Sequence, residues 1–120
     1  MSTNYLQQKI SAYFKNQKEV SLVYIFGSRA KNQANKKSDV DLAVLFSDER
    51  ENFFYLQGKY IEELSHLLDT KVDVVNLNTN DVAFSYRVIS EGKLLFERQP
   101  TERFKLVINL IKQYFDLKPS

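Results

Sequence analysis

The stretch that decides the fold reads VSLVYIFGS at residues 20–28 and, after a polar loop, SDVDLAVLF at residues 38–46. Both segments contain a run of β-branched, aromatic and aliphatic residues long enough for a buried strand, so strands are expected at 20–26 and 39–46. Asp39 and Asp41 open the second run. Side chains two apart on a strand share a face, so both carboxylates should point the same way at one end of a sheet.

This arrangement of carboxylates, glycine and serine is typical of a nucleoside-triphosphate site. Two like charges held close together raise each other's proton affinity unless a cation lies between them. Mg²⁺ suits such oxygen ligands and often links carboxylates to substrate phosphates. Gly27 and Ser28, at the end of the first strand, offer closely approaching backbone and a hydroxyl to phosphate groups. Alternatively, Asp39 and Asp41 accept local amide hydrogen bonds in a turn, and Ser28 caps a short helix.

A third carboxylate is expected on the next strand, at 71–77, where Asp73 lies near the start. If this strand lies beside 39–46, Asp73 completes a triad that can share a metal and accept the proton of an attacking hydroxyl. The alternative is a simple surface ion pair between Asp73 and Lys71.

The loop between Gly27 and Asp39 concentrates positive charge, with basic residues at Arg29, Lys31, Lys36 and Lys37. Charge patterning alone favours a solvated loop. Its position between the glycine turn and the carboxylates also makes Arg29 a candidate triphosphate contact. The net charge of +2 for the whole chain is too small to indicate bulk nucleic-acid binding.

Helical periodicity predicts the remaining elements. Helices are expected at 3–17, from a cap at Ser47-Asp48 to Leu68, from a cap at Asn80 or Asp81 to about Glu91 with Gly92 as C-cap, and at about 101–116; a short strand is expected at 93–97. The last helix carries an apolar face of Phe104, Val107, Ile108, Ile111, Tyr114 and Phe115. Such a face is more often core than interface, although a terminal helix can also dock on a partner.

The order of elements predicts an α/β (α+β) fold with a mixed sheet. The first two strands should pair antiparallel, and the helix between the second and third favours a parallel crossover. The helices are expected mainly on one face, which leaves the carboxylate face open, because a second layer there would bury charges without partners.

Composition limits the classes of protein. At 120 residues we expect one domain spanning 1–120, with an ordinary globular composition of 43% hydrophobic and 27% charged residues. The absence of cysteine excludes disulfides and thiolate metal sites. Neither a signal region nor an apolar stretch of bilayer-spanning length occurs, so a cytoplasmic location and no membrane partner are expected.

The pattern Gly27-Ser28, ten residues, Asp39-Val40-Asp41, then Asp73 on a later strand resembles the signature of the nucleotidyltransferase superfamily that includes DNA polymerase beta. The small size resembles the minimal nucleotidyltransferase (MNT, MntA-type) antitoxins, which pair with HEPN-domain toxins. The resemblance covers roughly residues 20–97.

The resemblance implies a nucleotidyltransferase fold and transfer of AMP from ATP to a tyrosine of a cognate HEPN toxin, which silences the toxin. It implies that Asp39 and Asp41 hold two Mg²⁺ ions, that Asp73 shares one ion and takes the acceptor's proton, and that Gly27 and Ser28 position the phosphates. The remaining alternatives are an antitoxin that acts by occlusion alone and a transferase of aminoglycoside-type small molecules.

Overall fold

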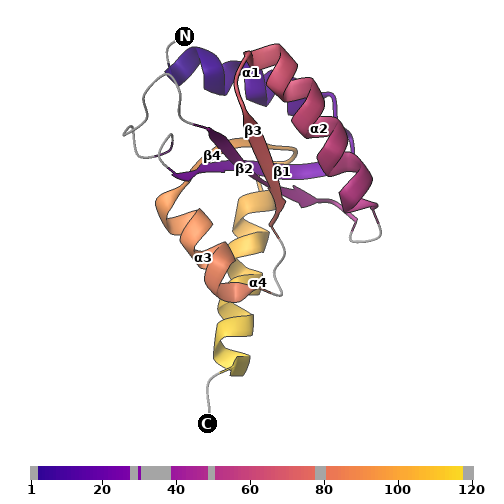
Figure 1. Ribbon diagram of the computed structural model, residues 1–120. Coiled ribbons are helices and arrows are strands. Elements are labelled where there is room, and N and C mark those ends of the chain that lie inside the picture. The colour runs from indigo at the N-terminus through magenta and orange to yellow at the C-terminus, as the bar shows by residue number, and fades with distance from the viewer. Residues whose placement is uncertain (1–2, 28–29, 31–38, 49–50, 78–80, 118–120) are drawn as a thin grey trace.

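The computed structural model describes residues 3–27, 30, 39–48, 51–77 and 81–117 (Figure 1). In chain order the elements are α1 (Thr3–Lys15), β1 (Val20–Phe26), β2 (Val40–Phe46), α2 (Phe53–Leu68), β3 (Val72–Asn76), α3 (Val82–Glu91), β4 (Lys93–Glu97) and α4 (Glu102–Leu117). This order confirms the predicted mixed α/β fold. Among the described residues, no helix combines the length and apolar character needed to cross a bilayer.

The four strands form one mixed sheet in the order β3-β2-β1-β4. β1 runs antiparallel to both β2 and β4, whereas β2 and β3 are parallel. Both predicted pairings are therefore confirmed. The parallel pair is linked by α2, which supplies the crossover that parallel strands require.

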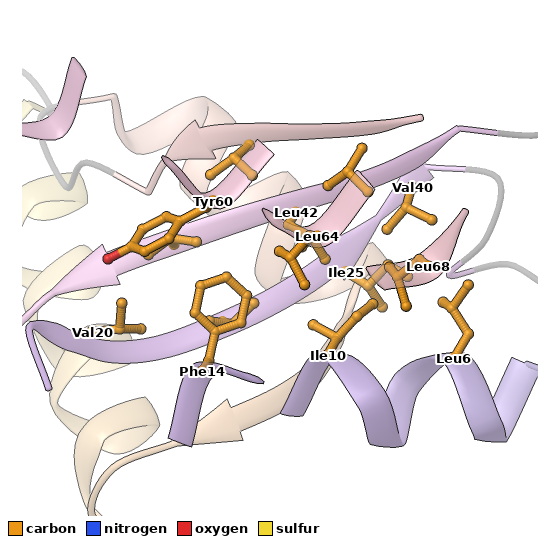
Figure 2. Close-up of a cluster of buried hydrophobic side chains, with 14 of the residues drawn as sticks. Leu6, Ile10, Phe14, Val20, Ile25, Val40, Leu42, Tyr60, Leu64 and Leu68 are labelled. Carbon is orange, nitrogen blue, oxygen red and sulfur yellow. The ribbon is translucent and has the colours of Figure 1, made fainter. Parts of the chain in front are cut away.

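One face of the sheet is covered by α1 and α2 (Figures 1 and 2). From α1, Ile10 and Phe14 reach the sheet, and from α2, Tyr60 and Leu64 pack against the same apolar surface. Tyr60 is fully buried, and its hydroxyl donates a 2.6 Å hydrogen bond to Glu19 Oε1. The polar atom of this large core ring is thereby satisfied at the rim of the core.

The opposite face of the sheet is covered by α3 and α4, so the expectation of helices mainly on one face is wrong. Leu22 and Tyr24 of β1 and Ala43 of β2 pack there against Val88 of α3 and Leu106 of α4. The reason is visible in β1, whose residues are apolar at both odd and even positions. A strand with this composition is buried on both sides.

The side of α4 that packs on the sheet is opposite to the side that the sequence predicts. Leu106 and Leu110 are the α4 residues buried against the sheet, and neither belongs to the predicted apolar face. Phe104, Ile111 and Phe115, which do belong to it, are exposed. The identification of that face as core is therefore wrong, because α4 has two apolar stripes and the smaller one packs inward.

Helix ends agree with the prediction at α3 and differ at α2. Asp81 caps α3, and its Oδ1 accepts a 3.0 Å hydrogen bond from the amide of Phe84. The cap of α2 is Asn52 rather than Ser47-Asp48, with Oδ1 accepting from Tyr55 N at 3.2 Å. A later cap shortens α2 by about one turn relative to the expectation.

Gly92 ends α3 as predicted, but not because it takes a left-handed conformation. Its φ is −86°, which any residue can adopt. A Cβ at this position would lie 2.5 Å from Val88 O and 2.7 Å from Ile25 O. Glycine is needed here because the helix end and strand β1 approach so closely.

Arg98, just after β4, ties the sheet to the end of α1. Its guanidinium donates to the carbonyls of Phe14 (3.1 Å), Lys15 (3.0 Å), Gln17 (2.6 Å) and Val20 (3.2 Å). These acceptors include carbonyls of the last helical turn, which have no partner within the helix. A positive charge is also favourable at a helix C-terminus.

We expect Arg98→Met to lower the free energy of unfolding by about 2–3 kcal/mol, because several charged hydrogen bonds to partly buried carbonyls are lost together. Urea denaturation measures the change. Arg87→Met, at an exposed arginine of α3, is the control and should remain within about 0.5 kcal/mol of the wild type. Equal stability of both variants would contradict the capping role.

Candidate active site

The structure brings two predicted carboxylates side by side through strand register. Asp41 of β2 pairs with Asp73 of β3 on one side and with Phe26 of β1 on the other. Paired residues of neighbouring strands point to the same face, and the strands lie about 4.8 Å apart. Asp41 and Asp73 therefore lie side by side at one end of the sheet, and together they form a row of carboxylates.

The carboxyl group of Asp41 lies close to the negative charges of Asp73 and Asp39. Burial raises the pKa of its carboxyl above the usual value, and the charges of Asp73 and Asp39 raise it further. The ammonium of Lys71 lowers this pKa and offsets part of the effect. A half-buried carboxylate with two like-charged neighbours is an environment that a bound cation would stabilise.

Gly27 makes room for Asp41. Its φ of +76° lies in the left-handed region that favours glycine. A Cβ on Gly27 would also lie only 2.7 Å from Asp41 Oδ2. The turn after β1 therefore brings bare backbone directly against the central carboxylate, as a close-approach role for this glycine predicts.

Asp39 lies just before β2 and forms an ion pair that the sequence reading missed. Its Oδ2 is 3.7 Å from Nζ of Lys71, and both side chains are largely exposed. The sequence offers Lys71 as an alternative partner for Asp73, and the structure pairs it with Asp39 instead. The strand register contained the signal, because the pairing of Val40 with Val72 puts Lys71 opposite Asp39.

Asp73 is exposed, and a neighbouring backbone amide orients its carboxylate. The amide of Val74 donates a 3.0 Å hydrogen bond to Asp73 Oδ1. Among the described residues, no three His, Cys, Asp or Glu side chains are arranged so that they could hold one metal ion. The three carboxylates are thus close enough to interact electrostatically, although as placed they do not converge on one point.

An aromatic pair borders the row, and it too escaped the sequence reading. Phe26, opposite Asp41, contacts the ring of Phe84 from α3 edge-to-face at a centroid distance of 5.8 Å. The register of β1 with β2 is the signal that could have identified Phe26. Ser28 and Arg29, predicted to bind the nucleotide, lie outside the described residues.

Comparisons with known proteins identify the family of the chain. Residues 8–101 match the family model described as Polymerase beta, Nucleotidyltransferase. The chain belongs to this nucleotidyltransferase family. The match includes Gly27, Asp39, Asp41 and Asp73, so the residues in the row and its glycine turn all lie within the family domain.

Two curated proteins that are similar to this chain are named protein adenylyltransferase MntA. The protein from Shewanella oneidensis is 28% identical over 100 residues, covering 83% of this chain and 70% of that protein. The protein from Aphanizomenon flos-aquae is 31% identical over 94 residues, covering 71% of this chain and 61% of the relative. The chain thus spans about two thirds of the length of these relatives.

Solved structures share the nucleotidyltransferase fold over nearly the whole chain. A crystal structure described as a toxin–antitoxin with AMP-PNP aligns with a TM-score of 0.72 at 26% identity, covering 98% of this chain and 90% of that one. A crystal structure of the toxin–antitoxin MntA-HepT aligns with a TM-score of 0.69 at 26% identity, covering 95% and 88%.

The two glycines Gly27 and Gly58 should respond oppositely to replacement by alanine. We expect Gly27→Ala to destabilise the fold by about 1–3 kcal/mol, since it adds left-handed strain and a clash with Asp41. Gly58 lies within α2 with nothing within 4 Å of an added Cβ, so Gly58→Ala should stabilise by about 0.5–1 kcal/mol. Urea denaturation tests both, and a neutral Gly27→Ala would contradict the close approach.

The pKa of Asp41 makes stability depend on pH in a defined direction. Because its folded pKa is raised, the folded state binds more protons than the unfolded one as pH rises from 3.8 toward the raised value. Stability is lost across that window and stays reduced above it. We therefore expect Asp41→Asn to be more stable than the wild type at pH 7 without divalent ions, and this gain to shrink below pH 3.8.

Denaturation at the two pH values, with Glu62→Gln of α2 as an exposed control, measures the difference. A gain for Asp41→Asn that is the same at both pH values would contradict the electrostatic account.

Proposed function

We propose that this chain is the antitoxin of a HEPN-domain toxin and a Mg²⁺-dependent protein adenylyltransferase, which transfers AMP from ATP to a tyrosine hydroxyl of that toxin. The observation that carries the proposal is the in-register pair of Asp41 and Asp73 beside the backbone of Gly27. The names of the MntA relatives and the AMP-PNP in a structural neighbour support AMP transfer from ATP.

The carboxylates fit a divalent ion on chemical grounds. Oxygen ligands are those that Mg²⁺ prefers, and the raised pKa of Asp41 reflects excess negative charge that a cation would relieve. Asp39 and Asp41, joined by Asp73, would hold two ions. To bind an ion, Asp39 would have to give up its ion pair with Lys71. Bound Mg²⁺ would offset the negative charge of the triphosphate oxygens.

The glycine turn provides the phosphate-binding part of the proposal. Gly27 offers backbone without a side chain next to Asp41, so a phosphate chain can approach the carboxylate row closely. The next two residues, Ser28 and Arg29, are proposed to contact the terminal phosphates through a hydroxyl and a guanidinium. Together they would hold the α-phosphate in line for attack.

In the transfer step, the tyrosine oxygen of the acceptor forms a bond to the α-phosphorus of ATP. The bond between the α-phosphorus and the oxygen that bridges to the β-phosphate breaks, and pyrophosphate leaves with that oxygen. Asp73, the exposed carboxylate at the edge strand of the row, accepts the tyrosine proton. The toxin leaves carrying an adenylyl group on its tyrosine.

A macromolecular acceptor suits the described part of the chain. There α1, α2, α3 and α4 are all used to cover the two faces of one sheet, so none of them encloses a small acceptor. A toxin brings its own folded surface to the site. We expect the reaction in the cytoplasm, where the toxin would act.

We expect Asp41→Asn and Asp73→Asn to lower AMP transfer by about 100-fold or more, because each removes a carboxylate that binds the ions or accepts the proton. The chain is incubated with ATP, Mg²⁺ and the product of the gene adjacent to its own, and the mass of that product is then measured by mass spectrometry. Asp81→Asn, at a cap where asparagine serves as well, is the control and should transfer normally.

Two results would contradict the proposal. Added adenylyl mass with either site variant at the wild-type rate would remove the carboxylates from the chemistry. Full suppression of toxicity in cells by Asp41→Asn would favour neutralisation by occlusion over catalysis.

A further inference from the structure

The outward side of α4 carries a second apolar stripe, which is largely exposed. Phe104, Ile108, Ile111 and Phe115 are 67%, 37%, 47% and 64% exposed. At 100° per residue these four lie within about 60° of one another on the helix. They point away from Leu106 and Leu110, which pack on the sheet. We call these four residues the α4 seam.

The spacing within the α4 seam is that of a coiled coil. Steps of four, three and four residues place its members at alternating d and a positions of a heptad. Lys105 and Lys112 then both occupy e positions, along one flank of the seam. Val107 and Tyr114 occupy the g positions on the other flank. The pattern therefore combines an apolar contact line with one basic border.

The seam is accessible along its length. Figure 1 shows α4 continuing past the end of α3 and away from the sheet. Phe115 contacts the ring of Tyr114 at a centroid distance of 5.8 Å and is still largely exposed. From Phe104 to Phe115 the seam extends about 17 Å.

We propose that the α4 seam docks against an amphipathic helix on the surface of the toxin, and that this helix carries acidic residues opposite Lys105 and Lys112. The inference rests on the proposed function and adds the surface by which the acceptor is held. An apolar seam with a like-charged border is complementary to an apolar stripe bordered by the opposite charge.

A second copy of this chain fits the seam less well. In an antiparallel pair of helices the e positions face each other, so Lys105 of one copy would meet Lys112 of the other and repel it. In a parallel pair each lysine would face Val107 or Tyr114, which offer no opposite charge. Charge therefore favours a different protein as the occupant.

The partner helix must also be part of a folded surface. The seam is shorter than two heptads, and isolated helices of that length are marginal in water. A helix already held in place by its own protein does not pay this ordering cost on binding. The occupant is accordingly a helix of a folded domain rather than a disordered peptide.

Docking on α4 separates holding the acceptor from the chemistry at the carboxylates. Binding energy from a remote contact lowers the KM for the toxin, whereas the rate at saturation depends on the site itself. We expect Ile111→Asp to weaken toxin binding at least about tenfold and to raise the KM for the toxin, with kcat unchanged. Gln8→Asp adds the same charge at an exposed position of α1, away from the seam and its lysines, and should leave both constants unchanged.

A double substitution of Lys105 and Lys112 tests the basic border. We expect Lys105→Glu combined with Lys112→Glu to weaken binding and to reverse its dependence on salt, since attraction across the border becomes repulsion that salt screens. Titration calorimetry with the product of the adjacent gene measures affinity. Far-UV circular dichroism and urea denaturation establish that each variant is folded.

The outcomes separate this inference from the proposed function. Wild-type affinity of a folded Ile111→Asp variant, with AMP transfer intact, would overturn the seam and leave the adenylyltransferase standing. If sedimentation shows the chain alone to be a dimer that Ile111→Asp makes monomeric, the seam joins two copies and the toxin helix is overturned. If the wild-type chain neither binds nor modifies the product of the adjacent gene, the proposed function fails, and the inference fails with it.

Discussion

The site depends on the register between β2 and β3, and the hydrophobic core sets that register. Val40, Leu42 and Val44 of β2 and Val72 and Val74 of β3 all point into the layer formed by α1 and α2. Slipping one strand by a single residue would turn its apolar side chains outward and an aspartate inward. Each buried valine or leucine contributes about 1.5–3 kcal/mol, whereas repulsion between partly exposed carboxylates amounts to about 1 kcal/mol per pair. The core therefore outweighs the repulsion and holds Asp41 beside Asp73.

Strand pairing also places the glycine turn next to the central carboxylate. Because β1 pairs antiparallel with β2, the end of β1 necessarily meets the start of β2, and Gly27 arrives at Asp41. A residue with a Cβ would displace the carboxylate, and one with an ordinary backbone preference would redirect the chain. The antiparallel pairing thus brings backbone without a side chain directly against a charged side chain.

Much of this arrangement could be predicted from the sequence, and the failures have physical causes. Strands, their pairing and the position of Asp73 follow from local periodicity and from the crossover helix. The rotation of α4 does not, because both Leu106 with Leu110 and the larger stripe from Phe104 have helical spacing. Contacts outside the helix decide between them: Ser21 of β1 donates a hydrogen bond to Glu102, and Glu97 of β4 accepts one from Arg103 N at 3.2 Å. Ser21 and Glu102 are 81 residues apart, so their contact leaves no local signal.

That rotation explains how one small domain can present two surfaces. With Leu106 and Leu110 inward, the bulkier residues of α4 face solvent, where an apolar line of this kind is unfavourable for the isolated chain. Turning the helix over would bury more apolar surface but would break the contacts of Glu102 and Arg103 with the sheet. The observed orientation of α4 therefore keeps the polar contacts of Glu102 and Arg103. It leaves the apolar residues on the outer side of α4 exposed, where a partner can bind them. The carboxylates lie at one end of the sheet, on the face that α3 and α4 cover, and α4 extends away from that sheet. A protein bound to the α4 seam can therefore be held beside the site that modifies it.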